Sequence, residues 1–299
     1  MQKIIRTLAM IVNTQKDPGL QTAGDTLGVL RDCPVTIRLS DRFRGTALGG
    51  TAENVCFCRD EELLNGADCV LVLGGDGSVI KAASSASVRR IPVLGINLGR
   101  VGYLAEVERG ELSVLPALCR GEYRIERRMM LDVSVIRDGK TIHTMKPALN
   151  DAVISNGAIS HMVDLSVSAG TGSGVNQFVA NFHADGVIAA TPTGSTAYSM
   201  SAGGPVIDPG LDCICLTPVC SHSLTARPML LSPASVLSIE NICTREDNTY
   251  LTVDGDENFK LLQHDVVSIA RSKVETQMIR LRESGFYSLL NRKMSRSEL

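Results

Sequence analysis

Apolar runs alternate with stretches of helical periodicity along the N-terminal part of the chain. The clearest run is 69–73, CVLVL, whose unbroken apolar character predicts a strand buried on both faces. Earlier in the chain, Asp17-Pro18 favours a helix start, and apolar residues recur after it at helical spacing. The expected strands are 3–12, 35–39, 67–73 and 91–96, and the expected helices are one from Asp17, 61–65, 78–87 and 111–120. This alternation predicts a parallel sheet, with ligands at the carboxyl ends of its strands.

The pattern changes after Gly121, where short strands and turn residues replace the helices. This spacing is typical of an antiparallel all-β domain, so we place a domain boundary near Gly121. The expected strands are 132–137, 141–145, 161–169, 175–182, 213–216, 236–242, 250–253 and 265–270. The chain therefore predicts an α/β domain followed by an all-β domain.

Composition and charge exclude several classes of protein. The chain has 299 residues, 44% of them hydrophobic and 21% charged, which is ordinary for globular domains. Its net charge of −2, without a long run of one sign, argues against a nucleic-acid partner. No segment has the length and apolar character of a membrane span, so no membrane partner is expected. The nine cysteines include no CxxC pair, which favours free thiols in a cytoplasmic protein over a zinc site.

A glycine-rich turn follows the buried strand 69–73. Gly74, Gly75 and Gly77 let backbone N–H groups approach an anion, and Ser78 can cap the helix that follows. The carboxylate of Asp76 would repel phosphate, so it needs another partner: a hydroxyl, the proton of that hydroxyl, or a metal ion. We therefore expect phosphoryl transfer. The alternative is a tight turn in which Asp76 merely caps a backbone N–H.

Two more loops follow predicted parallel strands. These are 13–16 and 97–103, and they join 74–78 at the expected carboxyl edge of the sheet. A convergence of three loops is stronger evidence for a ligand site than any single loop.

A second segment with candidate ligand-binding residues, 182–205, is rich in Gly, Ser and Thr. It contains an Asp185-Gly186 turn, and Ser195 or Thr196 could cap a short helix that Gly203-Gly204 would end. Hydroxyls, amides and the ring of Tyr198 suit a ribose and a stacked base. The alternatives are a Ser/Thr-rich loop without a ligand and a Tyr198 ring that belongs to the core.

Several motifs closely resemble those of the NAD kinase family, in the family's order over nearly the whole chain. They are Gly74–Ser78, Asn97–Leu104, Asn150-Asp151, Asp185-Gly186, Thr191–Ser199 and Ser221–Pro228. The glycine motif alone is shared with 6-phosphofructokinases and with diacylglycerol and sphingosine kinases, whereas the threonine–tyrosine segment is much more specific.

The resemblance implies a fold and a reaction. The fold would be a Rossmann-like domain, 1–121, to which 275–299 return, and a β-sandwich NAD-binding domain, 122–274. The reaction would transfer the ATP γ-phosphoryl group to the 2′-hydroxyl of the adenosine ribose of NAD. Mg²⁺ or another divalent metal would come bound with ATP, without dedicated protein ligands, and the chain would form a homodimer or homotetramer.

The resemblance also implies site residues. Asp76 would be the general base, and Gly74, Gly75, Gly77 and Ser78 would bind the ATP phosphates. The NAD-binding set would be Asp76, Gly77, Asn150, Asp151, His161, His183, Asp185, Thr196, Ala197, Tyr198, Ser201 and Asp256. We expect a structural role for His222. For His161 and His183, a structural role is an alternative of equal weight to NAD binding.

Three positions depart from the family pattern. Ser78 stands where many relatives have Thr, His183 where they often have a basic residue, and Asp256 where Gln is common.

Two other functions remain as alternatives: a lipid or sugar kinase that shares only the glycine motif, and a non-catalytic NADP-binding sensor. The first leaves 182–205 unexplained, and the second has no need for Asp76.

Overall fold

The structure is a computed structural model that describes residues 2–50, 53–99, 102–157, 162–171, 176–223, 225–244, 248–282 and 285–294. The chain divides into two compact units. The first comprises Met1–Arg127 and Thr276–Leu299, and the second comprises Arg128–Glu275. Strand β18 (Val266–Arg280) contributes to both units, because the division falls within it.

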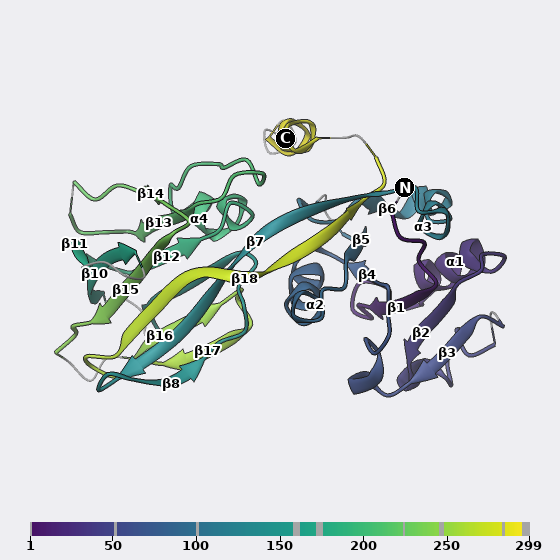
Figure 1. Ribbon diagram of the computed structural model, residues 1–299, viewed down its shortest axis with the longest axis horizontal. Coiled ribbons are helices and arrows are strands. Elements are labelled where there is room, and N and C mark those ends of the chain that lie inside the picture. The colour runs from purple at the N-terminus through teal and green to yellow at the C-terminus, as the bar shows by residue number, and fades with distance from the viewer. Residues whose placement is uncertain are drawn as a thin grey trace. The chain divides into compact units, whose positions relative to one another are not determined.

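The first unit is built on a parallel sheet in the order β3-β2-β1-β4-β5 (Figure 1). Its strands are β1 (Thr7–Val12), β2 (Thr36–Ser40), β3 (Val55–Cys58), β4 (Cys69–Gly74) and β5 (Val93–Asn97), with short β6 (Val107–Glu108) beside β5. Every residue of the central strand β4 is buried, as the unbroken apolar run predicted. The pairings among these strands are all parallel, so the expected parallel sheet is confirmed.

The first unit also contains helical segments. They are α1 (Gln21–Leu30), α2 (Asp76–Val88), α3 (Ala117–Arg120) and α5 (Phe286–Met294), and the 3₁₀ segments η1 (Asp41–Phe43), η2 (Asp60–Glu62) and η3 (Arg109–Val114). Apolar residues of the strands, α1 and α3 form one buried core. The C-terminal end of β18 pairs in parallel with β5 at Met278 and Val93.

Several expected helix boundaries are wrong. Asp17 does cap α1, because its carboxylate accepts the N–H groups of Thr22 and Ala23, but the helix begins only at Gln21. The left-handed backbone of Leu20 (φ 54°) explains the delay, since a helix cannot run through it.

The expected helix 61–65 is only the 3₁₀ segment η2, and 111–120 is divided between η3 and α3. Ser78 does not cap α2, which begins at Asp76 after Gly75 and carries no side-chain cap.

The second unit is an antiparallel β-sandwich. One sheet has the order β14-β13-β12-β9-β16-β17, and in the other β10 pairs with β11 and β15, and β15 with β18. Their strands are β9 (Asp151–Asn156), β10 (Val163–Thr171), β11 (Gln177–Ala184), β12 (Gly186–Ala190), β13 (Ile214–Val219), β14 (Met229–Leu231), β15 (Ser235–Asn241), β16 (Thr249–Val253) and β17 (Glu257–Lys260). Strands β7 (Arg124–Arg137) and β8 (Lys140–Thr144) extend the second sheet next to β18. Both sheets contribute to one buried core, which confirms the expected sandwich.

Four strands of the sandwich, β9, β12, β14 and β17, are absent from the expected set. Strand β12 is fully buried, yet its sequence GVIAA is short and stands within Ser- and Thr-rich segments. The expected cap at Ser195 or Thr196 is also wrong. The short helix α4 (Tyr198–Ser201) begins after Ala197 without a side-chain cap, although Gly203 (φ 88°) ends it as predicted.

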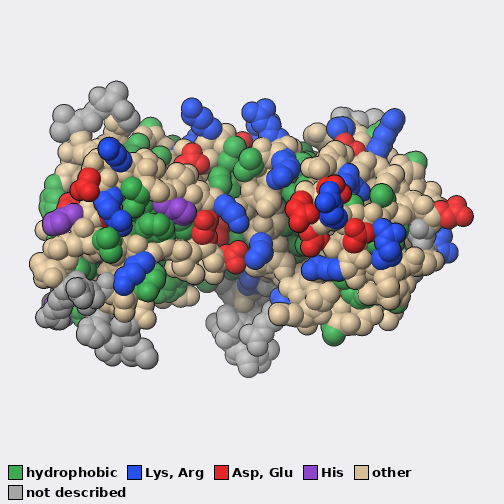
Figure 2. Space-filling view, turned by 90° about the horizontal axis from the view of Figure 1, so that it is seen from below, with side chains coloured by type: hydrophobic (Ala, Val, Ile, Leu, Met, Phe, Trp, Pro, Cys, Tyr) green, Lys and Arg blue, Asp and Glu red, His purple; other side chains and the backbone are tan. Residues whose placement is uncertain are grey.

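The surface carries mixed charge. On the face that Figure 2 shows, Lys and Arg side chains are interspersed with Asp and Glu. Among the described residues, no helix is long and apolar enough to cross a membrane. All nine cysteines are free thiols, and most of them are buried or half-buried.

Candidate active site

Three strand-end loops meet in the first unit, as the sequence predicted. The N–H of Asn13, after β1, donates to the carbonyl of Leu73 at 2.9 Å. The N–H of Leu98, after β5, donates to the carbonyl of Gly74 at 2.9 Å. The Asn13 amide also donates to the Ser78 hydroxyl at 2.9 Å. The loops after β1, β4 and β5 are therefore joined around the glycine turn.

Asp76 is the first residue of α2, and its half-buried carboxylate faces the loop after β5. One oxygen accepts the N–H of Tyr103 at 2.7 Å and the other accepts that of Leu104 at 3.1 Å. Gly102 makes this approach possible, because a Cβ there would overlap the Asp76 carboxylate. The carboxylate thus accepts backbone N–H groups of a distant loop rather than of its own helix. A carboxylate has about four lone-pair sites, so two remain available for a ligand.

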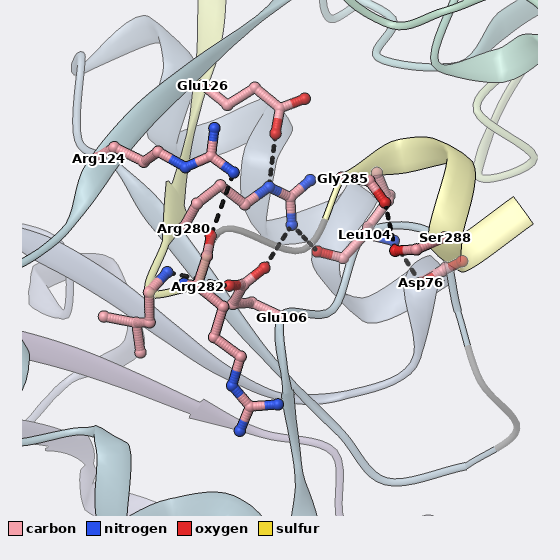
Figure 3. A network of polar contacts seen from close by, with 10 residues as sticks. Asp76, Leu104, Glu106, Arg124, Glu126, Arg280, Arg282, Gly285 and Ser288 are labelled. Carbon is pink, nitrogen blue, oxygen red and sulfur yellow. Dashed lines mark hydrogen bonds and ion pairs between the residues drawn. The ribbon is translucent and has the colours of Figure 1, made fainter.

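A buried ionic network holds that loop in place (Figure 3). The Arg280 guanidinium donates to the carbonyl of Leu104 at 3.4 Å and to the Glu106 carboxylate at 3.2 Å. It also donates to Glu126 at 2.6 Å. The side chains of Arg280 and Glu106 are only 8% and 7% exposed. Arg280 therefore fixes the peptide of Leu104, whose N–H in turn holds Asp76.

The C-terminal helix α5 contacts the same loop. The rings of Phe286 and Tyr103 are 6.4 Å apart between centroids, and the Lys293 ammonium lies 3.7 Å from the Tyr103 ring centroid. Burial lowers the pKa of Lys293, and the charge of Asp76 opposes this shift. Burial, with the charge of Asp76, raises the pKa of Tyr103. Sequence reasoning missed Phe286 and Lys293, since no local pattern connects α5 to the glycine loop.

Lys16 is a second residue that sequence reasoning missed. A Cβ at Gly75 would meet its ammonium, and one at Gly99 would lie 3.1 Å from it. The ammonium makes no hydrogen bond or ion pair with any other described side chain. It therefore lies over the glycine turn as an uncommitted cation, where an anion is expected. The signal was present, because Lys16 ends the loop that follows β1.

In the second unit, the backbone of Asn150 and Asp151 is held by Asp254. That carboxylate, from the turn between β16 and β17, accepts the N–H groups of Leu149, Asn150 and Asp151 at 2.8, 2.7 and 3.1 Å. Burial raises the pKa of Asp254, although these three hydrogen bonds oppose the shift. The Asp151 side chain starts β9 and is nearly buried. Burial, together with the charge of Asp254, raises the pKa of Asp151 to about 7.

The threonine-rich turn packs against the same backbone. Thr191 donates its N–H to the carbonyl of Asn150 at 2.8 Å and its hydroxyl to that of Leu149 at 2.6 Å. Gly194 is required here, because a Cβ would overlap the Asn150 carbonyl. The structure thus brings Asn150 and Asp151 together with the segment that contains Thr196.

Within that segment, Tyr198 and Ser201 are exposed, and Thr196 and Ala197 are half-buried. Tyr198 is 46% exposed, so its ring does not belong to the core. Ser195, by contrast, is fully buried, and its hydroxyl joins the carbonyl of Pro192 to the N–H of Ile207. Its role is structural.

The opposite end of β12 carries the other predicted residues. Asp185 precedes this strand and is exposed, whereas Ala190 at its far end pairs with Asp151. At about 3.3 Å per residue, the five steps from 185 to 190 separate the two groups by roughly 16 Å. His183 contacts Asp164 of the neighbouring strand at 2.6 Å, and its ring lies edge-on to His222.

Two further predicted residues remain. Asp256 is exposed in the turn after β16, and Asp254 of the same turn accepts hydrogen bonds from the Asn150-Asp151 backbone. His161 lies outside the described residues.

Comparison with known proteins identifies the family. Models of the ATP-NAD kinase N-terminal and C-terminal domains match residues 52–123 and 149–281. The NAD kinase of Symbiobacterium thermophilum is 44% identical over 229 residues, 76% of this chain and 78% of its own. That of Desulforamulus reducens is 35% identical over 291 residues, 97% of each chain.

Solved structures agree in fold. Yeast NADH kinase complexed with NADH superposes with a TM-score of 0.86 at 23% identity, over 98% of this chain and 89% of that one. An NAD kinase from Archaeoglobus fulgidus in complex with ATP gives a TM-score of 0.70 at 23% identity, over 96% and 97%. These similarities confirm the resemblance seen in the sequence motifs: the chain belongs to the NAD kinase family.

Proposed function

We propose that this chain transfers the γ-phosphoryl group of ATP to the 2′-hydroxyl of the adenosine ribose of NAD, which yields NADP and ADP. Family membership supports an enzyme that phosphorylates NAD. The observation that carries the proposal is Asp76, a carboxylate held by two backbone N–H groups at the start of α2. The alternative functions, a sensor and a lipid or sugar kinase, are not favoured.

Asp76 acts as the general base in this proposal. A free lone pair of its carboxylate accepts the proton of the 2′-hydroxyl while that oxygen attacks the γ-phosphorus. The new bond joins the ribose oxygen to phosphorus, and the bond from phosphorus to the β,γ-bridging oxygen breaks, so that ADP leaves. In a loose transition state the proton moves late, which makes the position of the base more important than its strength.

The glycine turn supplies the phosphate site. Gly74, Gly75 and Gly77 would present N–H groups of the turn and the first turn of α2 to the ATP phosphates. Ser78, whose N–H donates to the carbonyl of Gly75 at 2.9 Å, would donate its hydroxyl instead. The Lys16 ammonium over Gly75 would neutralise phosphate charge.

Mg²⁺ or another divalent ion would arrive bound to ATP. The described residues include no group of three or more His, Cys, Asp or Glu side chains that could hold a metal ion. These residues therefore fit a divalent ion whose ligands are phosphate oxygens and water rather than protein side chains.

The second unit would bind NAD. Asn150 can both donate to and accept from the adenine edge, and Asp151 can accept from an amine or a ribose hydroxyl. Thr196, Ala197, Tyr198 and Ser201 would line the adenosine pocket. His183 and Asp185, roughly 16 Å away along β12, would contact the nicotinamide end, a separation suited to the two ends of a dinucleotide. NAD contacts of Gly77, His161 and Asp256 remain predictions.

Three broader features belong to the proposal. Residues 1–121 with 275–299 would form the ATP domain, and 122–274 the NAD domain. The protein would be a cytoplasmic homodimer or homotetramer.

An activity assay tests the function directly. The purified protein is mixed with Mg-ATP and NAD, and product is detected by an NADP-specific dehydrogenase. We expect steady NADP formation. Binding of NADP without turnover would indicate the sensor instead, and the absence of NADP at high enzyme concentration would overturn the proposal.

Asn150→Ala tests the NAD site. We expect about fivefold weaker NAD binding, because one hydrogen bond contributes about 1 kcal/mol. Isothermal titration calorimetry measures the affinity, and Asn258→Ala, an exposed position on β17, serves as the control. An unchanged affinity for NAD would refute a ligand role for Asn150.

A further inference from the structure

The loop that holds the Asp76 carboxylate is itself held by the end of the chain. Tyr103 and Leu104 donate the two N–H groups that bind Asp76. Arg280 holds the second of these residues, because its guanidinium donates to the carbonyl of Leu104 at 3.4 Å. The first is held through its side chain by the helix α5, whose first turn Figure 3 shows next to Leu104 and Asp76.

One face of α5 contacts the Tyr103 ring. Phe286 and Lys293 are seven positions apart, about two helical turns, so they lie on the same face of the helix. The half-buried positions of α5, at 286, 289, 290 and 293, follow this spacing, whereas 287, 288 and 291 are exposed. The Phe286 ring centroid lies 6.4 Å from that of Tyr103, and the Lys293 ammonium lies 3.7 Å from the same centroid. Both distances are those of favourable aromatic and cation–π contacts.

We propose that Lys293, together with Phe286, is a positioning residue for the reaction: the two side chains hold the Tyr103 ring and thereby the N–H that aligns Asp76. The inference rests on the proposed function, because it concerns the base of that reaction. It makes the C-terminal helix a part of the catalytic apparatus, although the helix follows Asp76 by more than 200 positions.

The backbone at Tyr103 depends on such contacts. The residue before it is Gly102, where a Cβ would overlap the Asp76 carboxylate. Glycine loses more conformational freedom on folding than any other residue, so contacts of the neighbouring side chain have to fix this part of the loop. A misplacement of about 1 Å in a reacting group can cost on the order of a hundredfold in rate. Loosening of Tyr103 should therefore slow the reaction without removing a contact to either substrate.

The charge of Lys293 contributes to this hold. Its half-buried ammonium and the Asp76 carboxylate attract each other, since the charge of Asp76 opposes the lowering of the Lys293 pKa by burial. The attraction favours the arrangement in which the ammonium stays over the Tyr103 ring and Asp76 is ionised. An ionised carboxylate is the form that can accept the proton of the ribose hydroxyl.

Lys293→Met tests the role of the charge, because methionine keeps the length of the side chain. We expect the single-turnover rate of NADP formation to fall roughly fivefold, the loss typical of one cation–π contact, while calorimetric affinities for NAD and Mg-ADP stay unchanged. Lys293→Arg keeps a cation that can lie over the ring and should retain most of the rate. Lys140→Met, at an exposed position on β8, is the matched control and should behave as wild type.

Amide hydrogen exchange gives a readout that needs no turnover. The N–H of Tyr103 should exchange roughly fivefold faster in Lys293→Met, because a weaker hold on the ring lets its hydrogen bond to Asp76 open more often. The N–H of Val70, in the central strand β4, donates to the carbonyl of Pro92 and should exchange as in the wild type. This difference separates a local role at Tyr103 from a general loss of stability.

Phe286→Leu covers the case in which Lys293→Met does not fold. It keeps an apolar side chain on the same face of α5 and removes the ring contact, so the same two effects are expected. A folded variant with the wild-type rate and wild-type exchange at Tyr103 would overturn the proposal, and so would a loss of NAD affinity equal to the loss of rate. Failure of the wild-type protein to form NADP would instead count against the proposed function, while the exchange at Tyr103 would still test the contact with α5.

Discussion

Replacing Asp76 by asparagine is expected to lower the rate of NADP formation at least about a hundredfold, while NAD and Mg-ADP still bind. A positioned base contributes roughly 10²- to 10⁴-fold to a rate, and an amide cannot take the proton of the ribose hydroxyl. The size of the side chain is preserved, so the glycine turn keeps its space. Single-turnover rates and calorimetric affinities measure the two effects separately.

The contacts of Asp76 define the control for this experiment. Asparagine retains one acceptor for the N–H groups of Tyr103 and Leu104, but its amide N–H₂ would face the other as donor against donor. The loop is then held by Arg280 at the Leu104 carbonyl, so we expect a small change in melting temperature. Asp25→Asn, on the exposed face of α1, should behave as wild type. If NAD affinity fell as far as the rate, Asp76 would shape the loop rather than act as the base.

The glycine turn could be predicted from sequence because its signals are local. An unbroken apolar run, three glycines and a helical stretch follow one another between 69 and 87, and each indicates the same strand–turn–helix unit. The same holds for the meeting of the three loops, since parallel strands bring their carboxyl ends to one edge of a sheet. The prediction of where α1 begins was wrong because the local signals conflict. Asp17 caps the helix from several residues away, and Leu20 between them adopts a left-handed conformation.

The supporting residues could not be predicted, because they act across long separations in sequence. Asp254 holds the backbone of Asn150 from 104 positions away, and Arg280 holds Leu104 from 176. Neither has a local pattern that distinguishes it from other charged residues on strands and turns. Lys16 is intermediate, since its loop was singled out but its closeness to Gly75 depends on tertiary structure.

Replacing Asp151 by asparagine is expected to stabilise the protein at pH 8 while it weakens NAD binding. The folded protein keeps the Asp151 proton up to about pH 7, whereas the unfolded chain loses it near the ordinary pKa of 3.8. Between these values the folded state binds more protons, so the free energy of unfolding falls as pH rises. Asparagine has no such proton, so we expect the variant to gain melting temperature over the wild type at pH 8 and little at pH 4.

The same carboxyl group should make NAD affinity rise with pH, whereas it makes the stability of the protein fall with pH. Only the ionised form accepts a hydrogen bond at both oxygens, so wild-type affinity for NAD should rise as pH increases through 7. A hydrogen bond to a charged group contributes about 1.5 to 3 kcal/mol, so Asp151→Asn should bind NAD roughly 10- to 100-fold more weakly at pH 8, without this pH dependence. Asp132→Asn, at an exposed position on β7, is the control for both measurements. A variant that kept the wild-type pH dependence of both quantities would show that another group titrates. Gain of stability with loss of affinity would instead show two things. Burial of this ionised carboxylate destabilises the fold, and NAD binding requires the same ionised carboxylate.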